Sequence, residues 1–221
     1  MTAQRRSDST VPTQAAVFAS AAAQFSSRGF DGVSVEDIAK DAGVNKAMIY
    51  YHFADKVALY RAVVADGLMW MQDTTTAIVQ DGTTPARKID AFIAAFITLT
   101  EQRPWMPAIM LREISEGAPR LDADTMDRMR GTISNFAAIL AEGQRDGTFR
   151  PVHPILAYES VIGPIIINAA RERVAAQPHR QGTDMPMLVS ISNADLLAHA
   201  QEAARRMLAP STNASNKDTH Q

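Results

Sequence analysis

Apolar residues recur at helical spacing along most of the chain. Val17, Ala21 and Phe25 lie four residues apart, so they share one helix face, and valine and isoleucine elsewhere are scattered with a similar period. The chain has no run in which apolar and polar residues alternate between hairpin turn signals, which is the pattern of a half-buried strand. The pattern therefore predicts an all-α fold.

Capping residues, glycines and prolines divide this pattern into helices. Ser34 and Asn45 have side chains that commonly cap a helix N-terminus, Gly29 and Gly43 are natural C-terminal stops, and Pro85 suits a first helical turn. The expected helices cover residues 13–27, 34–42, 45–52, 55–72, 85–101, 106–116, 122–145, 154–176 and 193–208. A loop rich in turn formers is expected at 177–186, and polar tails at both ends.

The segment Ser34–Phe53 reads SVEDIAKDAGVNKAMIYYHF and has the spacing of a helix-turn-helix. A first short helix ends at Gly43, and a short turn separates it from a second one. Ala39 is small where the two helices cross, and Ile49 and Phe53, four residues apart, anchor the second helix inward. The face left for the major groove of DNA consists of Lys46, Ala47, Tyr50 and Tyr51.

A longer pattern around this segment resembles the TetR family of bacterial repressors. It reads Phe25-x-x-x-Gly29, Ser34-Val35-x-x-Ile38-Ala39, Ala42-Gly43-Val44-Asn45-Lys46, Ile49-Tyr50-Tyr51-His52-Phe53 and Lys56-x-x-Leu59. The resemblance implies an N-terminal DNA-binding domain at 11–71, with the helix-turn-helix at 34–53. It also implies a helical regulatory and dimerisation domain at 72–210, followed by a disordered tail at 211–221.

The same resemblance implies a function and a set of DNA contacts. The expected function is a sequence-specific repressor that a small, mainly hydrophobic ligand releases from a palindromic operator in double-stranded DNA. The alternative is a DNA-binding dimer whose C-terminal domain binds a protein partner or no ligand. By position, the residues implied to contact DNA are Ser34, Asn45, Lys46, Ala47, Tyr50, Tyr51, His52 and Lys56.

Charge supports this interpretation less than the motif does. The formal net charge is −2, and residues 1–60 hold six basic and six acidic side chains. Gln14 stands where many family members carry a basic residue, for which Arg5 and Arg6 are candidate substitutes. Asp41 and Asp55 lie near the expected DNA side, so we expect modest non-specific affinity.

The later helices carry methionines and aromatic residues that suit an adaptable apolar pocket and suit a plain core equally well. The candidate ligand residues are Met69, Trp70, Phe92, Phe96, Trp105, Met106, Met110, Arg112, Phe136, Tyr158 and Asn168. Arg112 has a second interpretation, because Glu116 is four residues away and the two could form an ion pair within one helix.

The last two long helices are expected to form a homodimer interface, as the family implies. Their apolar faces would assemble a four-helix bundle from two subunits. The candidate interface residues are Leu156, Ile162, Ile166, Leu196, Leu197, Ala200 and Ala204.

Other function classes are disfavoured. The chain has no cysteine, which excludes disulfides and thiolate chemistry, and its five histidines show no metal-binding spacing. No glycine-rich phosphate loop or serine elbow is present, so we expect neither an enzyme nor a cofactor or metal site. Apolar runs are too short for a membrane span, and we expect a cytoplasmic protein.

Overall fold

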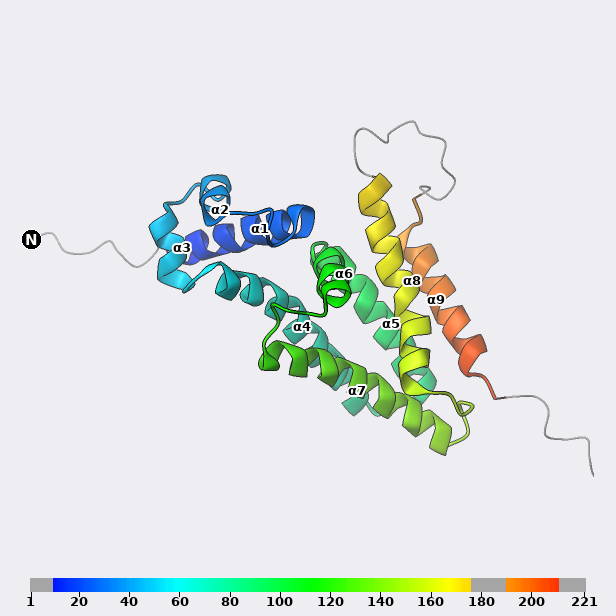
Figure 1. The fold of residues 1–221 in the computed structure, drawn as a ribbon. Helices are drawn as coiled ribbons and strands as arrows, with labels where there is room; N and C mark the ends of the chain where they lie inside the picture. Colours follow the sequence, from blue (N-terminus) through cyan, green and yellow to red (C-terminus); the bar gives the residue numbers. More distant parts are fainter. Residues whose placement is uncertain (1–9, 176–189, 211–221) are drawn as a thin grey trace, which may run out of the picture. The chain divides into compact units, whose positions relative to one another are not determined.

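The computed structural model describes residues 10–175 and 190–210, and over these ranges the chain forms nine α-helices and no strand (Figure 1). The all-α prediction is therefore confirmed. The helices are α1 (Thr10–Arg28), α2 (Val35–Asp41), α3 (Lys46–His52), α4 (Lys56–Gln80), α5 (Pro85–Gln102), α6 (Met106–Glu116), α7 (Ala123–Arg145), α8 (Pro154–Ala175) and α9 (Asn193–Leu208). The expected loop at 177–186, the tail at 211–221 and both Arg5 and Arg6 lie outside the described residues.

One helix end was predicted wrongly. We expected the fourth helix to end near Gln72, but α4 continues to Gln80 through a run of three threonines. Thr75 is fully buried, and its hydroxyl donates to the Met71 carbonyl at 2.9 Å, the bond by which a threonine fits inside a helix. Burial and this local bond outweigh the low helix propensity of threonine.

The chain divides into two compact units. The first comprises the chain up to Met69 together with Arg103–Asp127, and the second comprises Trp70–Gln102 together with the chain from Arg128 onward. The first unit therefore contains α6 as well as α1, α2, α3 and the start of α4. The sequence had suggested a single division near residue 71, with α6 in the C-terminal domain.

The core of the first unit lies where α1 packs against α2, α3 and α6. Val17, Phe25, Ile38, Ile49 and Leu59 are 0–1% exposed. Burying such a side chain stabilises the fold by roughly 1.5–3 kcal/mol, so these contacts hold the short helices α2 and α3 in place. Neither short helix would be stable in water by itself.

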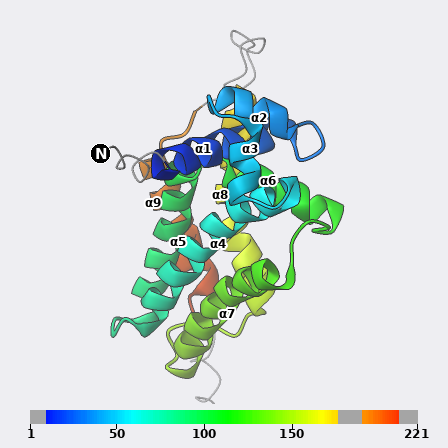
Figure 2. The same cartoon turned by 90° about the vertical axis from the view of Figure 1, so that its left-hand side faces the viewer.

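In the second unit, α5 packs against α8 and α9, and α8 and α9 contact each other (Figures 1 and 2). Phe92 of α5 and Phe136 of α7 are fully buried, with ring centroids 5.2 Å apart. Polar contacts add to this packing, because Arg205 of α9 donates to both carboxylate oxygens of Asp90 at 2.9 Å. None of the described helices is long and apolar enough to cross a membrane.

Candidate nucleic-acid interface

The helix-turn-helix is held together by backbone contacts at its turn. The Val44 amide donates to the Ala39 carbonyl at 2.9 Å, which closes the turn after α2. Gly43 has a φ of +67°, a conformation that L residues rarely adopt, so glycine is required at this point. The turn ends at Asn45, which is the N-cap of α3.

The two tyrosines of α3 face away from the core. Tyr50 is 46% and Tyr51 76% exposed, whereas Ile49 of the same helix is 1% exposed. This orientation agrees with the face that the sequence pattern left for DNA. Phe53, expected as a second inward anchor, is only half-buried and forms the C-cap of α3.

Lys46, the first residue of α3, has an acidic partner on α2. Its ammonium group forms an ion pair with the Glu36 carboxylate and lies 5.6 Å from the centroid of the Tyr50 ring. The hydrogen bond from Lys46 lowers the pKa of Glu36, and the same bond raises the pKa of Lys46. The charge expected to meet DNA is therefore paired in the free protein.

Ser34 and Asn45 cap helices, yet each keeps a hydrogen-bond donor for another partner. Ser34 Oγ accepts from the Asp37 amide at 3.0 Å, and Asn45 Oδ1 accepts from the Ala47 amide at 2.9 Å. Because a hydroxyl and an amide also donate, the Ser34 hydroxyl proton and the Asn45 amino group can still bind phosphate.

Asp37 completes a capping box with Ser34 and also binds α1. Its Oδ2 accepts from the Ser34 amide at 3.1 Å and from Arg28 at 2.9 Å. These hydrogen bonds, first those with Ser34 and then that from Arg28, lower the pKa of Asp37. The N-terminus of α2 is thus tied to the C-terminal turn of α1.

His52 and Lys56, two of the residues expected to contact DNA, lie in different surroundings. His52 Nε2 is buried and has no hydrogen-bond partner among the described residues, so this nitrogen does not face solvent. The Lys56 ammonium lies 4.1 Å from the centroid of the Phe30 ring, a cation–π distance. Lys56 is therefore positioned at the start of α4 by an aromatic side chain from the α1–α2 loop.

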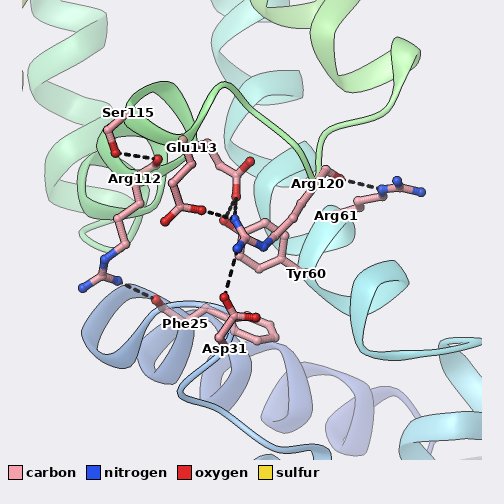
Figure 3. A network of polar contacts seen from close by, with 9 residues as sticks. Phe25, Asp31, Tyr60, Arg61, Arg112, Glu113, Ser115 and Arg120 are labelled. Carbon is pink, nitrogen blue, oxygen red and sulfur yellow. Dashed lines mark hydrogen bonds and ion pairs between the residues drawn. The ribbon is translucent and has the colours of Figure 1, made fainter.

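Behind this surface, a polar network around the buried Glu113 connects α4, α6 and the α1–α2 loop (Figure 3). Glu113 of α6 is 0% exposed, and its Oε1 accepts from the Tyr60 hydroxyl at 2.6 Å and from Arg120 at 3.1 Å. Arg120 also binds Glu116 at 2.5 Å and Asp31 at 3.2 Å. Burial, followed by the hydrogen bond to Glu113, raises the pKa of Tyr60.

The N-terminal helices match a known family model. Residues 17–63 match the model for bacterial regulatory proteins of the tetR family. The HTH-type transcriptional repressor KstR2 of Mycolicibacterium smegmatis is 30% identical over 132 residues, covering 59% of this chain and 64% of that protein. The HTH-type transcriptional regulator RutR of Escherichia coli is 27% identical over 154 residues, covering 69% of this chain and 72% of that protein.

The N-terminal region of the chain, residues 17–63, is therefore of the TetR type. The match to KstR2 spans less than two thirds of that relative's length. These relatives are named as a transcriptional repressor and a transcriptional regulator.

Solved TetR-family structures share its fold. The ketosteroid transcriptional regulator KstR2 of Mycobacterium tuberculosis aligns with a TM-score of 0.73 at 19% identity, covering 93% of this chain and 98% of that one. The TetR-family regulator PfmR from Thermus thermophilus aligns with a TM-score of 0.68 at 21% identity, covering 86% of this chain and 97% of that one. These structures confirm the predicted architecture of an N-terminal helix-turn-helix followed by a helical domain.

The candidate ligand residues fall in both compact units. The first unit contains Met69, Trp105, Met106, Met110 and Arg112. Trp105 packs edge-on against Phe18 with ring centroids 6.0 Å apart, and Met106 fills the space over Gly67, where a Cβ would lie 2.8 Å from the sulfur. Met69 is 45% exposed.

Arg112 has a role that the sequence did not predict. Its guanidinium donates to the carbonyls of Phe25 and Ser26, each at 3.0 Å, and to the Ser27 carbonyl at 3.3 Å. A cation at a helix C-terminus is favourable because it binds the unpaired carbonyls there. The pairing of Arg112 with Glu116 does not occur, because Glu116 binds Arg120 instead.

The second unit brings four of the remaining candidates together. The rings of Phe92, Phe96, Phe136 and Tyr158 form one cluster, in which Tyr158 lies 5.6 Å from Phe136 and 6.1 Å from Phe96. Burial raises the pKa of Tyr158. Trp70 is half-buried, and Asn168 accepts from Arg171 at 2.6 Å on its own helix.

Candidate dimer residues differ in exposure. Leu156 of α8 is 63% exposed, and two isoleucines of the same helix, Ile155 at 40% and Ile167 at 60%, are exposed as well. Ile166 and Leu197 are half-buried, whereas Ile162, Leu196, Ala200 and Ala204 are buried within the single chain. The exposed apolar surface of α8 is therefore formed by Ile155, Leu156 and Ile167.

Among the described residues, no group of three or more His, Asp or Glu could hold a metal ion. The functional side chains that sequence reasoning missed are Glu36, Asp31, Tyr60, Glu113 and Arg120. Of these, only Glu113 had a sequence signal, because it is one of several charged residues on a helix that otherwise reads as buried.

Proposed function

We propose that this chain is a sequence-specific DNA-binding transcriptional regulator of the TetR family that reads its operator with α3. The observation that carries the proposal is the pair of exposed tyrosines beside Lys46 on a capped recognition helix. Aromatic and basic side chains at the start of such a helix reach base edges and phosphates in the major groove. Ser34 and Lys56 would hold the register through phosphate contacts.

We infer further that the regulator is a repressor and acts as a homodimer on a palindromic operator in double-stranded DNA. The relative KstR2 is named a repressor, which supports the direction of regulation. Leu156, Ile155 and Ile167 expose apolar surface on α8, and such surface on a folded chain favours association with a second copy. Two recognition helices related by a two-fold axis would then contact two half-sites.

The proposed signal is a small, mainly hydrophobic effector that binds in the second unit. The aromatic cluster around Tyr158 supplies the chemistry for such a ligand. Helix α4 contains residues of both units and begins at Lys56, so a change of α4 at its C-terminal half can reach a DNA contact along one continuous helix. The effector would act by favouring one of two conformations.

One observation supports the alternative of a dimer with a protein partner or no ligand. Phe92 and Phe136 are fully buried against each other, which is how a plain core is packed. A thermal-shift screen with apolar compounds separates the effector hypothesis from this alternative, because an effector must raise the melting temperature. A compound that does so must also release DNA.

The DNA contacts are tested by operator binding in a fluorescence anisotropy titration, after an operator has been selected from random duplexes. Tyr50→Ala and Lys46→Ala should each abolish specific binding while the helical circular dichroism spectrum is retained. Arg206→Ala removes a charge from α9 as a control and should bind as the wild type does. Unchanged binding by both α3 variants would refute the proposed interface.

A further inference from the structure

A cavity of about 180 Å³ lies within the first unit, between the α1–α2 loop and α6. Its lining includes Phe25, Phe30, Tyr60, Glu113, Glu116 and Arg120. We propose that this cavity is a binding site for a small organic cation, an ammonium or guanidinium group on a body of about the size of benzene. The proposal goes beyond the regulatory function above and does not depend on it, because binding is measured without DNA.

The three carboxylates at this cavity share one directly bonded cationic partner. Asp31, Glu113 and Glu116 all line it, and all three bind the same guanidinium, that of Arg120. Glu113 is enclosed, with 1% of its side chain exposed, and the Arg120 side chain is 17% exposed. Asp31 and Glu116 are exposed to solvent at 85% and 45%, so Glu113 is the enclosed carboxylate that would gain most from an additional cation.

The other two arginines that line the cavity are engaged elsewhere. Arg28 forms an ion pair with Asp37 at 2.9 Å, and Arg112 donates to the three carbonyls of residues 25–27. Neither guanidinium is bonded to the three carboxylates of the cavity, and the three arginines and three carboxylates together make its lining formally neutral.

One carboxylate oxygen identifies the point of binding. Glu113 Oε1 accepts from Tyr60 and Arg120, while Oε2 is buried and, within the described part of the chain, has no hydrogen-bond partner. Figure 3 shows the Oε1 side of the carboxylate turned toward Tyr60 and Arg120. A buried acceptor without a donor is unfavourable, so a ligand that donates an N–H to Oε2 gains a charge-assisted hydrogen bond.

Aromatic rings form the apolar part of the lining and suit the same kind of ligand. Phe25, Phe30 and Tyr60 form one cluster, with ring centroids 5.0 Å apart between Phe25 and Tyr60 and 5.2 Å apart between Phe30 and Tyr60. Phe30 already attracts two cations, because the Lys56 ammonium lies 4.1 Å and the Arg120 guanidinium 5.0 Å from its ring centroid. Aromatic rings beside a buried carboxylate are the surroundings in which organic cations bind.

The cavity volume sets the size of the ligand. An engineered protein cavity of roughly 150 Å³ accommodates benzene. At about 180 Å³, this cavity holds a ring or a short aliphatic chain with one charged group. Benzylamine is therefore the probe, and benzyl alcohol is its neutral counterpart of nearly equal shape.

The test is isothermal titration calorimetry of the full-length protein without DNA. Benzylamine should bind with one site per chain, and benzyl alcohol at least about tenfold more weakly, because it lacks the charge that Glu113 recognises. Glu113→Gln should weaken benzylamine binding about tenfold or more. Glu202→Gln, on the exposed surface of α9, removes the same charge elsewhere and should leave binding unchanged.

A second variant keeps the proposal falsifiable if Glu113→Gln does not fold. Phe30 is half-buried in a loop, so Phe30→Leu should fold and should weaken benzylamine binding several-fold through the loss of the aromatic face. Equal affinity for benzylamine and benzyl alcohol would overturn the proposal. So would the absence of benzylamine binding, or wild-type affinity in Phe30→Leu.

Discussion

The hydroxyl of Tyr60 in α4 donates a hydrogen bond of 2.6 Å to the buried carboxylate of Glu113 in α6. The two residues are 53 positions apart in the sequence, and both belong to the first compact unit. A carboxylate that is 0% exposed needs such donors, because burial without them is strongly unfavourable. The bond therefore fixes α6 against the start of the helix that carries Lys56.

We predict that Tyr60→Phe destabilises the protein. The variant keeps the ring and its contacts with Phe25, but it removes a donor from a buried carboxylate, which costs about 1–3 kcal/mol. Urea unfolding followed by circular dichroism measures the change. Tyr50→Phe, at an exposed position, should change stability by less than about 0.5 kcal/mol, and an equally small effect in Tyr60→Phe would contradict the assigned bond.

We predict that Glu36→Gln increases the affinity for non-specific duplex DNA. Lys46 is paired with Glu36 in the free protein, so binding to phosphate must break this pair and leave a carboxylate near the DNA. Without that carboxylate, the slope of log affinity against log salt should become more negative by about one. Anisotropy titrations at several salt concentrations measure the slope, and Glu202→Gln, the matched control on α9, should keep the wild-type value.

How much of this structure the sequence predicts depends on how far apart the interacting residues lie along the chain. Helices α6 and α9 were predicted to the residue, because local periodicity and capping determine their ends. The helix-turn-helix and its outward tyrosines followed from a contiguous motif. Arg112 was misjudged for the opposite reason, since its partners on α1 are 85–87 residues away and no local pattern encodes them.

The proposed dimer surface also shows where prediction from sequence stops. A helical pattern shows that Leu196 and Ala200 are apolar, but it cannot show whether they face the chain's own core or a second copy. In the structure both are 7% exposed. The sequence therefore identified the helices, whereas the surface available to a partner depends on how the chain packs on itself.

We predict that the Asp37 capping box stabilises the fold at neutral pH and less so in acid. Hydrogen bonds from Ser34 and Arg28 lower the pKa of Asp37 in the folded state below its ordinary value of 3.8. A group with a lowered folded pKa contributes stability above its unfolded pKa and loses it as the pH falls through the folded value. Acid unfolding should therefore show a smaller difference between wild type and Asp37→Asn below pH 3.8 than at pH 7. A difference in stability that does not change with pH would contradict the assigned role.

We predict that Leu156→Glu weakens the homodimer. Leu156 is 63% exposed on α8, and a charge placed there would be buried without a partner in a two-subunit bundle. Sedimentation equilibrium should show a higher dissociation constant, with helical content retained by circular dichroism. Ile114→Glu is the matched control, because Ile114 is 64% exposed on α6 and the change of side chain is nearly the same. If both variants dimerise as tightly as the wild type, the interface does not use Leu156, and if both dissociate equally, the effect reflects added charge rather than contact at α8.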